Sequence, residues 1–281
     1  MGEAVSVRTA ARWVGADRRL AGVVALVAVP LFLSDLLTAS STPWVLGFVL
    51  GILVTGYELS VARAVVEEAH GLPPVISGLG AHIRRGLSVT ALAMVPVVVI
   101  YVIAFALVAL LGELGVFGGS AQFLLAASIA LIPLLQVLVL VCVGGRYAHF
   151  DRLRAGFAYR DALGRFVRHW RSGLHAAGFP VVWGLGLVTF RYLVGKAVQA
   201  PGLRDSGAAA WSLLSGHASL NGFLVITAVL VVSLLGAFGS VIGGVLIGQY
   251  SGVAFGRLDA LPPLAEQALQ LDAPQAAHNA G

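Results

Sequence analysis

Apolar residues are concentrated in long windows along the chain. A helix needs about 20 mostly apolar residues to cross the hydrocarbon core of a bilayer, which is about 30 Å thick. Six such windows are bounded by charged or turn-forming residues, at roughly 20–38, 43–57, 87–112, 121–145, 173–195 and 221–250. The second is short, but the helical pattern continues beyond it through Leu59 and Ala62. The pattern therefore predicts an all-α, polytopic integral membrane protein with six transmembrane helices.

The predicted helices share features in alternation. The odd-numbered helices each begin beside a basic residue followed by Gly or Leu, and each contains a proline, at Pro30, Pro96 and Pro180. The even-numbered helices each end at a Gly–Tyr element with an arginine one or two turns later. These elements are Gly56-Tyr57 with Arg63, Gly145-Arg146-Tyr147 with Arg152, and Gly248-Gln249-Tyr250 with Arg257. We interpret the chain as three repeated helical hairpins, although Tyr and Arg also gather at the ends of unrelated membrane helices.

Basic residues lie almost entirely on one side of this topology. Short loops rich in Arg and Lys stay cytoplasmic, and 15 of the 17 basic residues outside the spans fall on the side of the two termini. The exceptions are Lys196 and Arg204. The sequence thus predicts a cytoplasmic amphipathic segment at 1–19, a membrane domain at 20–257 and a disordered cytoplasmic tail at 258–281. Seventeen arginines against one lysine suggest a GC-rich bacterial genome, and hence the inner membrane.

Composition narrows the protein class further. Apolar residues make up 58% of the chain and charged residues only 11%, with a mean hydropathy of +0.92. A soluble domain carries about 25% charged residues, and a disordered chain needs low hydrophobicity. Cys142 is the only cysteine, which excludes a disulfide-stabilised secreted domain.

Several blocks of the chain carry a family resemblance. They are Arg12-Trp13 through Arg18-Arg19-Leu20, Gly56-Tyr57-Glu58-Leu59-Ser60-Val61-Ala62-Arg63 followed by Leu72-Pro73-Pro74 and Arg85-Gly86-Leu87, and Gly145-Arg146-Tyr147 with Ala155-Gly156-Phe157. In order and spacing, over roughly residues 8–200, they resemble the DUF4013 family of prokaryotic multi-pass membrane proteins. The resemblance implies a membrane domain of six-helix type and uncharacterised function, and it brings no active-site residue.

The segment at 149–172 combines arginines with aromatic and aliphatic residues. Its apolar positions form two amphipathic pieces, with a break expected near Ala158 to Asp161. This pattern is typical of a helix lying in the membrane interface, with Arg at anionic lipid headgroups. The residues predicted to contact the membrane surface are Arg152, Arg154, Arg160, Arg165, Arg168, Trp170 and Arg171. The alternatives are topology anchoring alone and docking of a cytoplasmic partner, whereas nucleic acid is not expected as a partner because the chain has no room for a water-exposed domain.

Small residues recur at four-residue spacing in the last helix and, more briefly, in the second. Such a stripe lets two helix backbones approach closely in lipid. The predicted packing or partner-interface residues are Gly236, Ser240, Gly244, Gly248, Gly252, Gly47 and Gly51. The stripe serves either packing within the chain or a seam with another subunit.

Two ionisable residues fall inside predicted spans. At 1.5 Å of rise per residue, Asp35 and Arg191 lie at similar depth toward the outer interface. We expect them to form an intramembrane ion pair, the alternatives being separate snorkelling to water and a role in transport.

No set of residues predicts catalysis, a cofactor or a metal. The histidines lack metal-ligand spacing, and no phosphate-binding loop or nucleophile elbow is present. The favoured function is a non-catalytic membrane scaffold or accessory subunit that binds partner helices, or copies of itself, through Gly-rich faces. The alternatives are a transporter-like subunit, suggested by the prolines in corresponding helices, and a membrane enzyme acting on lipid.

Overall fold

The computed structural model describes residues 5–39, 44–69, 71–113, 137–197 and 220–256, and every regular element in these ranges is a helix. The long helices are α2 (Leu20–Ala39), α3 (Trp44–Val66), α4 (Leu79–Glu113), α9 (Trp170–Ala197) and α11 (Leu220–Phe255). The short ones are α1 (Val7–Gly15), α6 (Gly145–Phe150), α7 (Leu153–Gly156) and α8 (Tyr159–Arg168), with a π-helical turn, η1 (Leu140–Gly144), directly before α6. The all-α class predicted from the sequence is therefore confirmed.

The number of membrane-spanning helices is confirmed only in part. Three helical stretches in the described residues are long and apolar enough to cross a bilayer, namely Gly47–Val66, Trp170–Phe190 and Phe223–Phe255. Shorter apolar helices occupy Leu20–Ser34 and Val137–Phe150. Most of the fourth predicted window, 121–145, lies outside the described residues, as does the predicted tail at 258–281. The structure thus gives several apolar helices but not a clear set of six, and the three-hairpin repeat is not evident among them.

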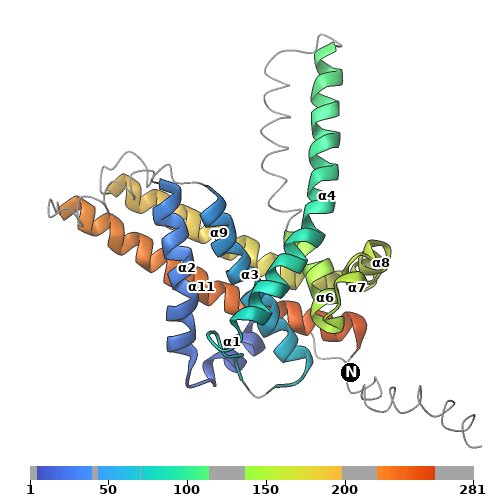
Figure 1. Ribbon diagram of the computed structural model, residues 1–281, viewed down its shortest axis with the longest axis horizontal. Coiled ribbons are helices and arrows are strands. Elements are labelled where there is room, and N and C mark those ends of the chain that lie inside the picture. Colours follow the sequence, from blue (N-terminus) through green and yellow to red (C-terminus); the bar gives the residue numbers. More distant parts are fainter. Residues whose placement is uncertain (1–4, 40–43, 70, 114–136, 198–219, 257–281) are drawn as a thin grey trace, which may run out of the picture.

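Helix α11 lies at the centre of the arrangement. It packs against α3, α9, α2 and α6, while α3 also packs against α4. Figure 1 shows the second half of α4 extending away from the other described helices. The core accordingly lies where α2, α3, α9 and α11 meet, and it includes Val61, Leu246, Ile247 and Tyr250.

Glycines set the closest helix crossings. A Cβ atom at Gly56 would collide with the carbonyl group of His82, and one at Gly86 would collide with the carbonyl of Ile52. Each of these two glycines thus allows α3 and α4 to touch backbone to backbone. Because both belong to the sequence blocks that carry the family resemblance, the structure gives those blocks a packing role.

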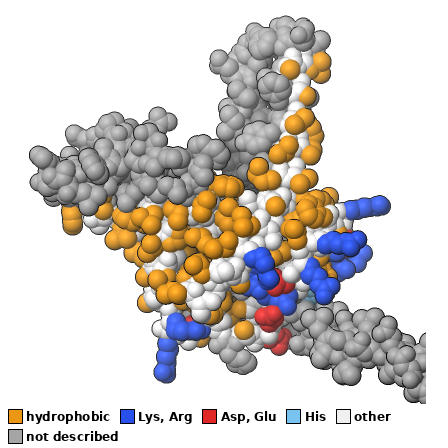
Figure 2. All heavy atoms as spheres, in the orientation of Figure 1, with side chains coloured by type: hydrophobic (Ala, Val, Ile, Leu, Met, Phe, Trp, Pro, Cys, Tyr) orange, Lys and Arg blue, Asp and Glu red, His pale blue; other side chains and the backbone are white. Residues whose placement is uncertain are grey.

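Charged side chains gather at one end of the molecule. Figure 2 shows apolar side chains spread over the middle of the visible face, with Lys and Arg side chains at the lower end and on the right. In the same orientation, Figure 1 shows α1 low in the view and the short helices α6, α7 and α8 on the right. A bilayer would therefore enclose the apolar band, with the charged end in the headgroup region or in water.

Candidate functional site

Arg63 ties the end of α3 to the end of α6. Its Nη1 donates to the carbonyl oxygens of Ala148, at 3.0 Å, and His149, while its Nε donates to Glu67 at 2.6 Å. Helix α6 ends at Asp151, whose φ of 48° lies in the left-handed region. The last carbonyls of a helix lack intrahelical partners and carry partial negative charge. Arg63 therefore caps α6 from another helix.

A second polar cluster joins α3 to α4. The Ser60 hydroxyl lies 2.7 Å from His82 Nδ1, and His82 Nε2 lies 3.0 Å from the Pro74 carbonyl. A carbonyl only accepts, so in the neutral ring Nε2 donates to Pro74 and Nδ1 is an acceptor, which shares the single Ser60 hydroxyl proton with the Gly56 carbonyl at 2.9 Å. Burial lowers the pKa of His82, which favours that neutral form. Ser60 and His82 are only 2% and 3% exposed, so this serine–histidine contact fastens two helices and does not present a nucleophile to solvent.

Arg85 extends this cluster to the α6–α7 connection. Its Nη1 donates to Ser60 Oγ at 3.1 Å, and its Nη2 pairs with Asp151 at 3.1 Å. Arg84 pairs with the same carboxylate at 3.3 Å. The start of the short-helix group is thus held on the base of α4.

Helix α8 is attached to the helix assembly along one side. Asp161 pairs with Arg146 of α6, Arg165 donates to the Ala254 carbonyl at 2.8 Å, and Tyr159 donates to the Leu92 carbonyl at 2.7 Å. The ring of Phe166 packs edge-on against Tyr250. Helix α8 therefore contacts α4, α6 and the end of α11, and these three elements fix its orientation.

The rest of the α8 surface divides into an apolar strip and a polar strip. Leu163, Val167 and Trp170, just beyond its end, are 59%, 63% and 51% exposed. At 100° per residue, Leu163 and Val167 lie between the attached side of α8 and a polar side formed by Arg160, Gly164 and Arg168, while Trp170 begins α9. An exposed apolar strip beside arginines is the arrangement of an interfacial helix.

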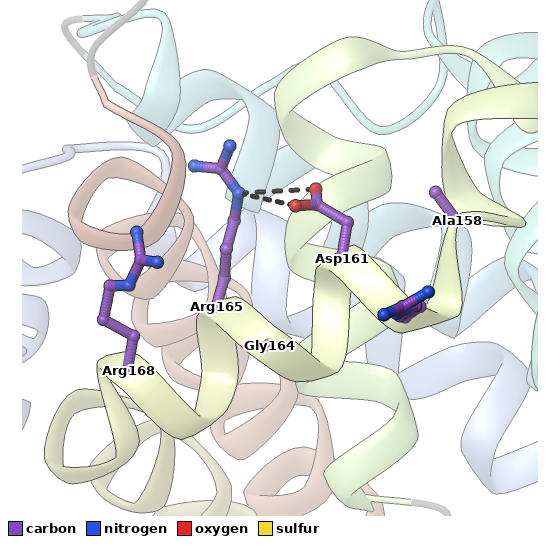
Figure 3. Close-up of a pocket in the computed structure, with 6 residues that line it drawn as sticks. Ala158, Asp161, Gly164, Arg165 and Arg168 are labelled. Carbon is purple, nitrogen blue, oxygen red and sulfur yellow. Dashed lines mark hydrogen bonds and ion pairs between the residues drawn. The ribbon is translucent and has the colours of Figure 1, made fainter.

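The polar strip borders an open pocket. It has a volume of about 500 Å³ and is lined by Ala158, Arg160, Asp161, Gly164, Arg165 and Arg168 (Figure 3). Arg165 is already engaged, because its Nε lies 3.3 Å from the Asp161 carboxylate and its guanidinium covers the Phe255 ring. Arg160 and Arg168 are exposed and have no ion-pair partner among the described residues. The pocket therefore presents two unneutralised guanidinium groups, which favour an anion.

The structure separates the predicted surface residues into two sets. It brings Arg160, Arg165 and Arg168 together at the pocket, whereas Arg152 and Arg154 lie exposed at α7, away from the pocket lining. Arg171 lies over the Trp170 ring, 5.5 Å from its centroid. The predicted break in the segment at 149–172 lies between α7 and α8, because α8 begins at Tyr159.

Only some residues of the predicted small-residue stripe lie in close contact with another helix. Gly244 and Gly248 face α3 so closely that an added Cβ would lie 2.5 Å from the Glu58 carbonyl oxygen and 2.6 Å from that of Ala62. An added Cβ at Gly236 would meet the Leu31 side chain at 3.3 Å, while Gly51 and Gly252 have nothing within 4 Å. Ser240 and Gly47 are half-buried. The side chains of the expected Asp35–Arg191 pair lie outside the described residues.

Sequence reasoning missed the buried carboxyl of Glu58 and the links made by Asp17 and Asp151. Asp17 lies between α1 and α2, where it accepts from Arg19 and from the Leu72 backbone at 2.7 Å. The only sequence signal was the spacing Asp-x-Arg before an apolar helix, which does not reveal the distant Leu72. Asp17 thus joins the N-terminal segment to the loop that precedes α4.

The Asp17 link should make the protein sensitive to acid. Hydrogen bonds from Arg19 lower the pKa of Asp17 from 3.8 to about 2. A lowered folded-state pKa means that the stabilisation is present above pH 3.8 and is lost as the pH falls toward about 2. Thermal unfolding in mild detergent should show the wild type losing its advantage over Asp17→Asn across this interval. If the wild type stays more stable than Asp17→Asn by the same amount down to about pH 2, the ionised Asp17 carboxylate does not make this stabilising link.

Comparison with known proteins adds one match. The family described as "Protein of unknown function (DUF4013)" matches residues 41–194, a shorter stretch than the resemblance noted in the sequence. No curated protein and no solved structure matches the chain. Because the match covers more than half of the 281 residues, the chain belongs to the DUF4013 family.

Proposed function

We propose that this protein is a non-catalytic integral membrane component that holds α8 at the membrane surface, where Arg160 and Arg168 bind the phosphate groups of anionic lipids. The observation that carries the proposal is the open pocket with two unpaired guanidinium groups. The attached side of α8 supports it, since contacts to α4, α6 and α11 hold the helix in one orientation.

The exposed apolar strip of α8 supports a lipid over a free anion. Leu163 and Val167 would enter the acyl boundary while the neighbouring arginines meet headgroups. A free phosphate ion would make no use of this strip. The ligand class that fits both strips is an anionic phospholipid.

The finer topology belongs to the same proposal. We propose six spans in three hairpins, both termini in the cytoplasm and a location in the bacterial inner membrane. The family membership and the apolar helices support a membrane location, and the distribution of arginines supports the orientation. Labelling of cysteines introduced at Ser40 and Ser206 from outside intact cells would test it.

Lipid binding can be measured with purified protein in mild detergent. Phosphatidylglycerol should bind with higher affinity than phosphatidylcholine, and native mass spectrometry can count the retained lipids. Each surface arginine contributes about 1 kcal/mol to anionic lipid binding, so Arg160→Gln with Arg168→Gln should weaken binding by about 2 kcal/mol, or about thirtyfold. The difference in lipid affinity between the wild type and this double variant should be smaller at high salt, because salt screens the charges.

A matched control removes the same charge elsewhere. Arg8 and Arg12 are exposed on α1, so Arg8→Gln with Arg12→Gln lowers the net charge equally without touching the pocket. If both double variants lose the same affinity for phosphatidylglycerol, net charge alone explains the loss, and this result would contradict a lipid site on α8.

A role as an accessory subunit remains part of the proposal. Gly51 and Gly252 have nothing within 4 Å of an added Cβ, which leaves these two stripe positions open to a helix of another subunit or copy. Co-purification in mild detergent, compared with the Gly51→Leu and Gly252→Leu variants, would test such contacts.

A transporter-like subunit is the second candidate function. It is favoured by prolines inside three long helices, Pro30 in α2, Pro96 in α4 and Pro180 in α9. Prolines in corresponding helices can mark the points where transporters with repeated units open or bend their helices, and here α2, α4 and α9 continue through them. Accessibility of cysteines along these helices that changes with pH or membrane potential would favour it.

A further inference from the structure

One carboxyl group lies deep in the contact between α3 and α11. Glu58 belongs to the apolar stretch Gly47–Val66 and is only 9% exposed. Its Oε1 lies 2.7 Å from the place that a Cβ on Gly243 would occupy, and its carbonyl oxygen faces Gly244. The carboxyl therefore lies directly against the backbone of α11, in space that only glycine at position 243 leaves open.

This carboxyl has no partner among the described residues: no hydrogen bond or ion pair there involves Glu58. The charged and titratable groups on the neighbouring elements contact other groups, but Tyr250 Oη and His149 Nδ1 are buried without a hydrogen-bond partner among the described residues. His82 and Arg85 of α4 contact Ser60, Arg146 of α6 pairs with Asp161, the ring of His149 of α6 meets that of Phe150 edge-on, the ring of Tyr250 of α11 packs against Phe166, and Arg63 caps α6. The described side chains of α2, up to Ser34, include no ionisable group.

An ionised carboxylate in this place would have no counter-ion among the described residues and little contact with water, since Glu58 is only 9% exposed. Such a group is costly in an apolar interior, and an ionisable residue inside a membrane span marks a functional site by default. A neutral carboxyl fits, since its hydroxyl can donate to a backbone carbonyl of the facing helix. A metal ion would need several oxygen ligands, and in the described part of the chain no three His, Cys, Asp or Glu residues lie so that they could hold a metal ion together.

We propose that Glu58 is a proton-binding site between α3 and α11, and that release of its proton loosens this helix contact. The closed packing accommodates the neutral carboxyl, and the charged form requires water or a cation. A ligand that binds one conformation more tightly shifts the population toward it, and the coupling is reciprocal. The proton is that ligand here, and it favours close contact of Glu58 with Gly243 and Gly244. The site is separate from the lipid pocket of α8 and does not depend on it.

Carbodiimide labelling can detect the protonated carboxyl in the full-length protein. The apolar reagent dicyclohexylcarbodiimide takes the carboxyl proton on one nitrogen while the carboxylate oxygen adds to its central carbon, and the adduct rearranges to a stable N-acylurea. Peptide mass spectrometry should place the adduct on Glu58. Glu67 is the matched comparison, because it lies just beyond α3, is 48% exposed and pairs with Arg63, so it should stay unmodified. Glu58→Gln should remove the adduct.

The pH dependence of labelling decides whether the proton exchanges. Between about pH 5 and about pH 10, labelling of the wild type should fall about tenfold per pH unit once the carboxyl ionises. After correction for the intrinsic, base-catalysed pH dependence of amide exchange, hydrogen exchange of peptides from the middle of α11 should rise over the same interval in the wild type and stay constant in Glu58→Gln.

Three results would overturn the proposal, and all are obtained with the wild type, whatever the stability of the variant. Labelling that is constant over the whole pH range would make Glu58 a permanently neutral packing group. No labelling in folded protein at any pH would show that the contact around Glu58 never opens, which contradicts a helix contact that loosens when the proton is released. Protection by sodium chloride but not by choline chloride, at one pH and ionic strength, would assign the site to a metal cation.

Discussion

Alanine at Gly244 should destabilise the protein strongly, whereas alanine at Gly252 should not. An added Cβ at Gly244 would lie 2.5 Å from the Glu58 carbonyl oxygen and 3.0 Å from Val61 Cβ, while Gly252 on the same helix has nothing within 4 Å. Neither neighbour at Gly244 is the flexible end of a side chain, so α3 and α11 must move apart. Overpacking of this kind costs about 1 to 3 kcal/mol or more, and leucine at Gly244 should prevent folding.

Gly252 is a matched control because alanine at this position should stabilise the protein, whereas alanine at Gly244 should destabilise it. Replacing glycine by alanine inside a helix stabilises by up to about 1 kcal/mol where space allows. Thermal unfolding in mild detergent and the yield of monodisperse protein would measure both variants. Equal behaviour of Gly244→Ala and Gly252→Ala would mean that the α3–α11 contact does not need glycine.

Removal of the Arg63 side chain should be the most damaging single change among the arginines. Arg63 is 18% exposed at its side chain and donates to two carbonyls at the end of α6. Hydrogen bonds from a charged donor contribute about 1.5 to 3 kcal/mol each, and an acceptor left without a donor adds its own cost. Arg63→Ala should therefore lower the free energy of unfolding by about 3 kcal/mol.

Arg84 provides the comparison for this change. Its side chain is 64% exposed and makes one pair with Asp151, at 3.3 Å, and exposed ion pairs contribute about 1 kcal/mol or less. Arg84→Ala should thus cost much less in the same unfolding assay. Arg63→Lys should be intermediate, because a single ammonium group lacks the fork of donors that spans two carbonyls. Similar losses for Arg63→Ala and Arg84→Ala would show that Arg63 does not cap α6.

The parts of the fold that the sequence predicted are those governed by local pattern. Long apolar runs predict helices because a bilayer requires each backbone group to be satisfied within its own segment, and α3, α9 and α11 follow this rule. The second amphipathic piece predicted within 149–172, after the break near Ala158 to Asp161, corresponds to α8. The prolines at 30, 96 and 180 did not end their helices, as is common in membrane segments.

The contacts between distant residues could not be predicted in the same way. Spacing along the last helix placed Gly244 and Gly248 on one face, but it could not show that the facing residues are Glu58 and Ala62 of α3. Glu58 itself stands at the end of an apolar window, where a carboxyl normally reaches water. Only the packing of α11 over it turns an ordinary helix-end residue into a buried group.

The π-helical turn η1 has a consequence for the evolution of the family. A π-turn arises when one extra residue is inserted into an α-helix and the flanking turns keep their orientation. The turn at Leu140–Gly144 directly precedes α6, in which Tyr147 and His149 are buried and Arg146 pairs with Asp161 of α8. A family member that lacks one residue in this stretch would therefore present the same α6 face, with an uninterrupted α-helix in place of the bulge. Alignments within the family should place a single-residue gap at η1, and the arginine that follows it should keep its place against Asp161.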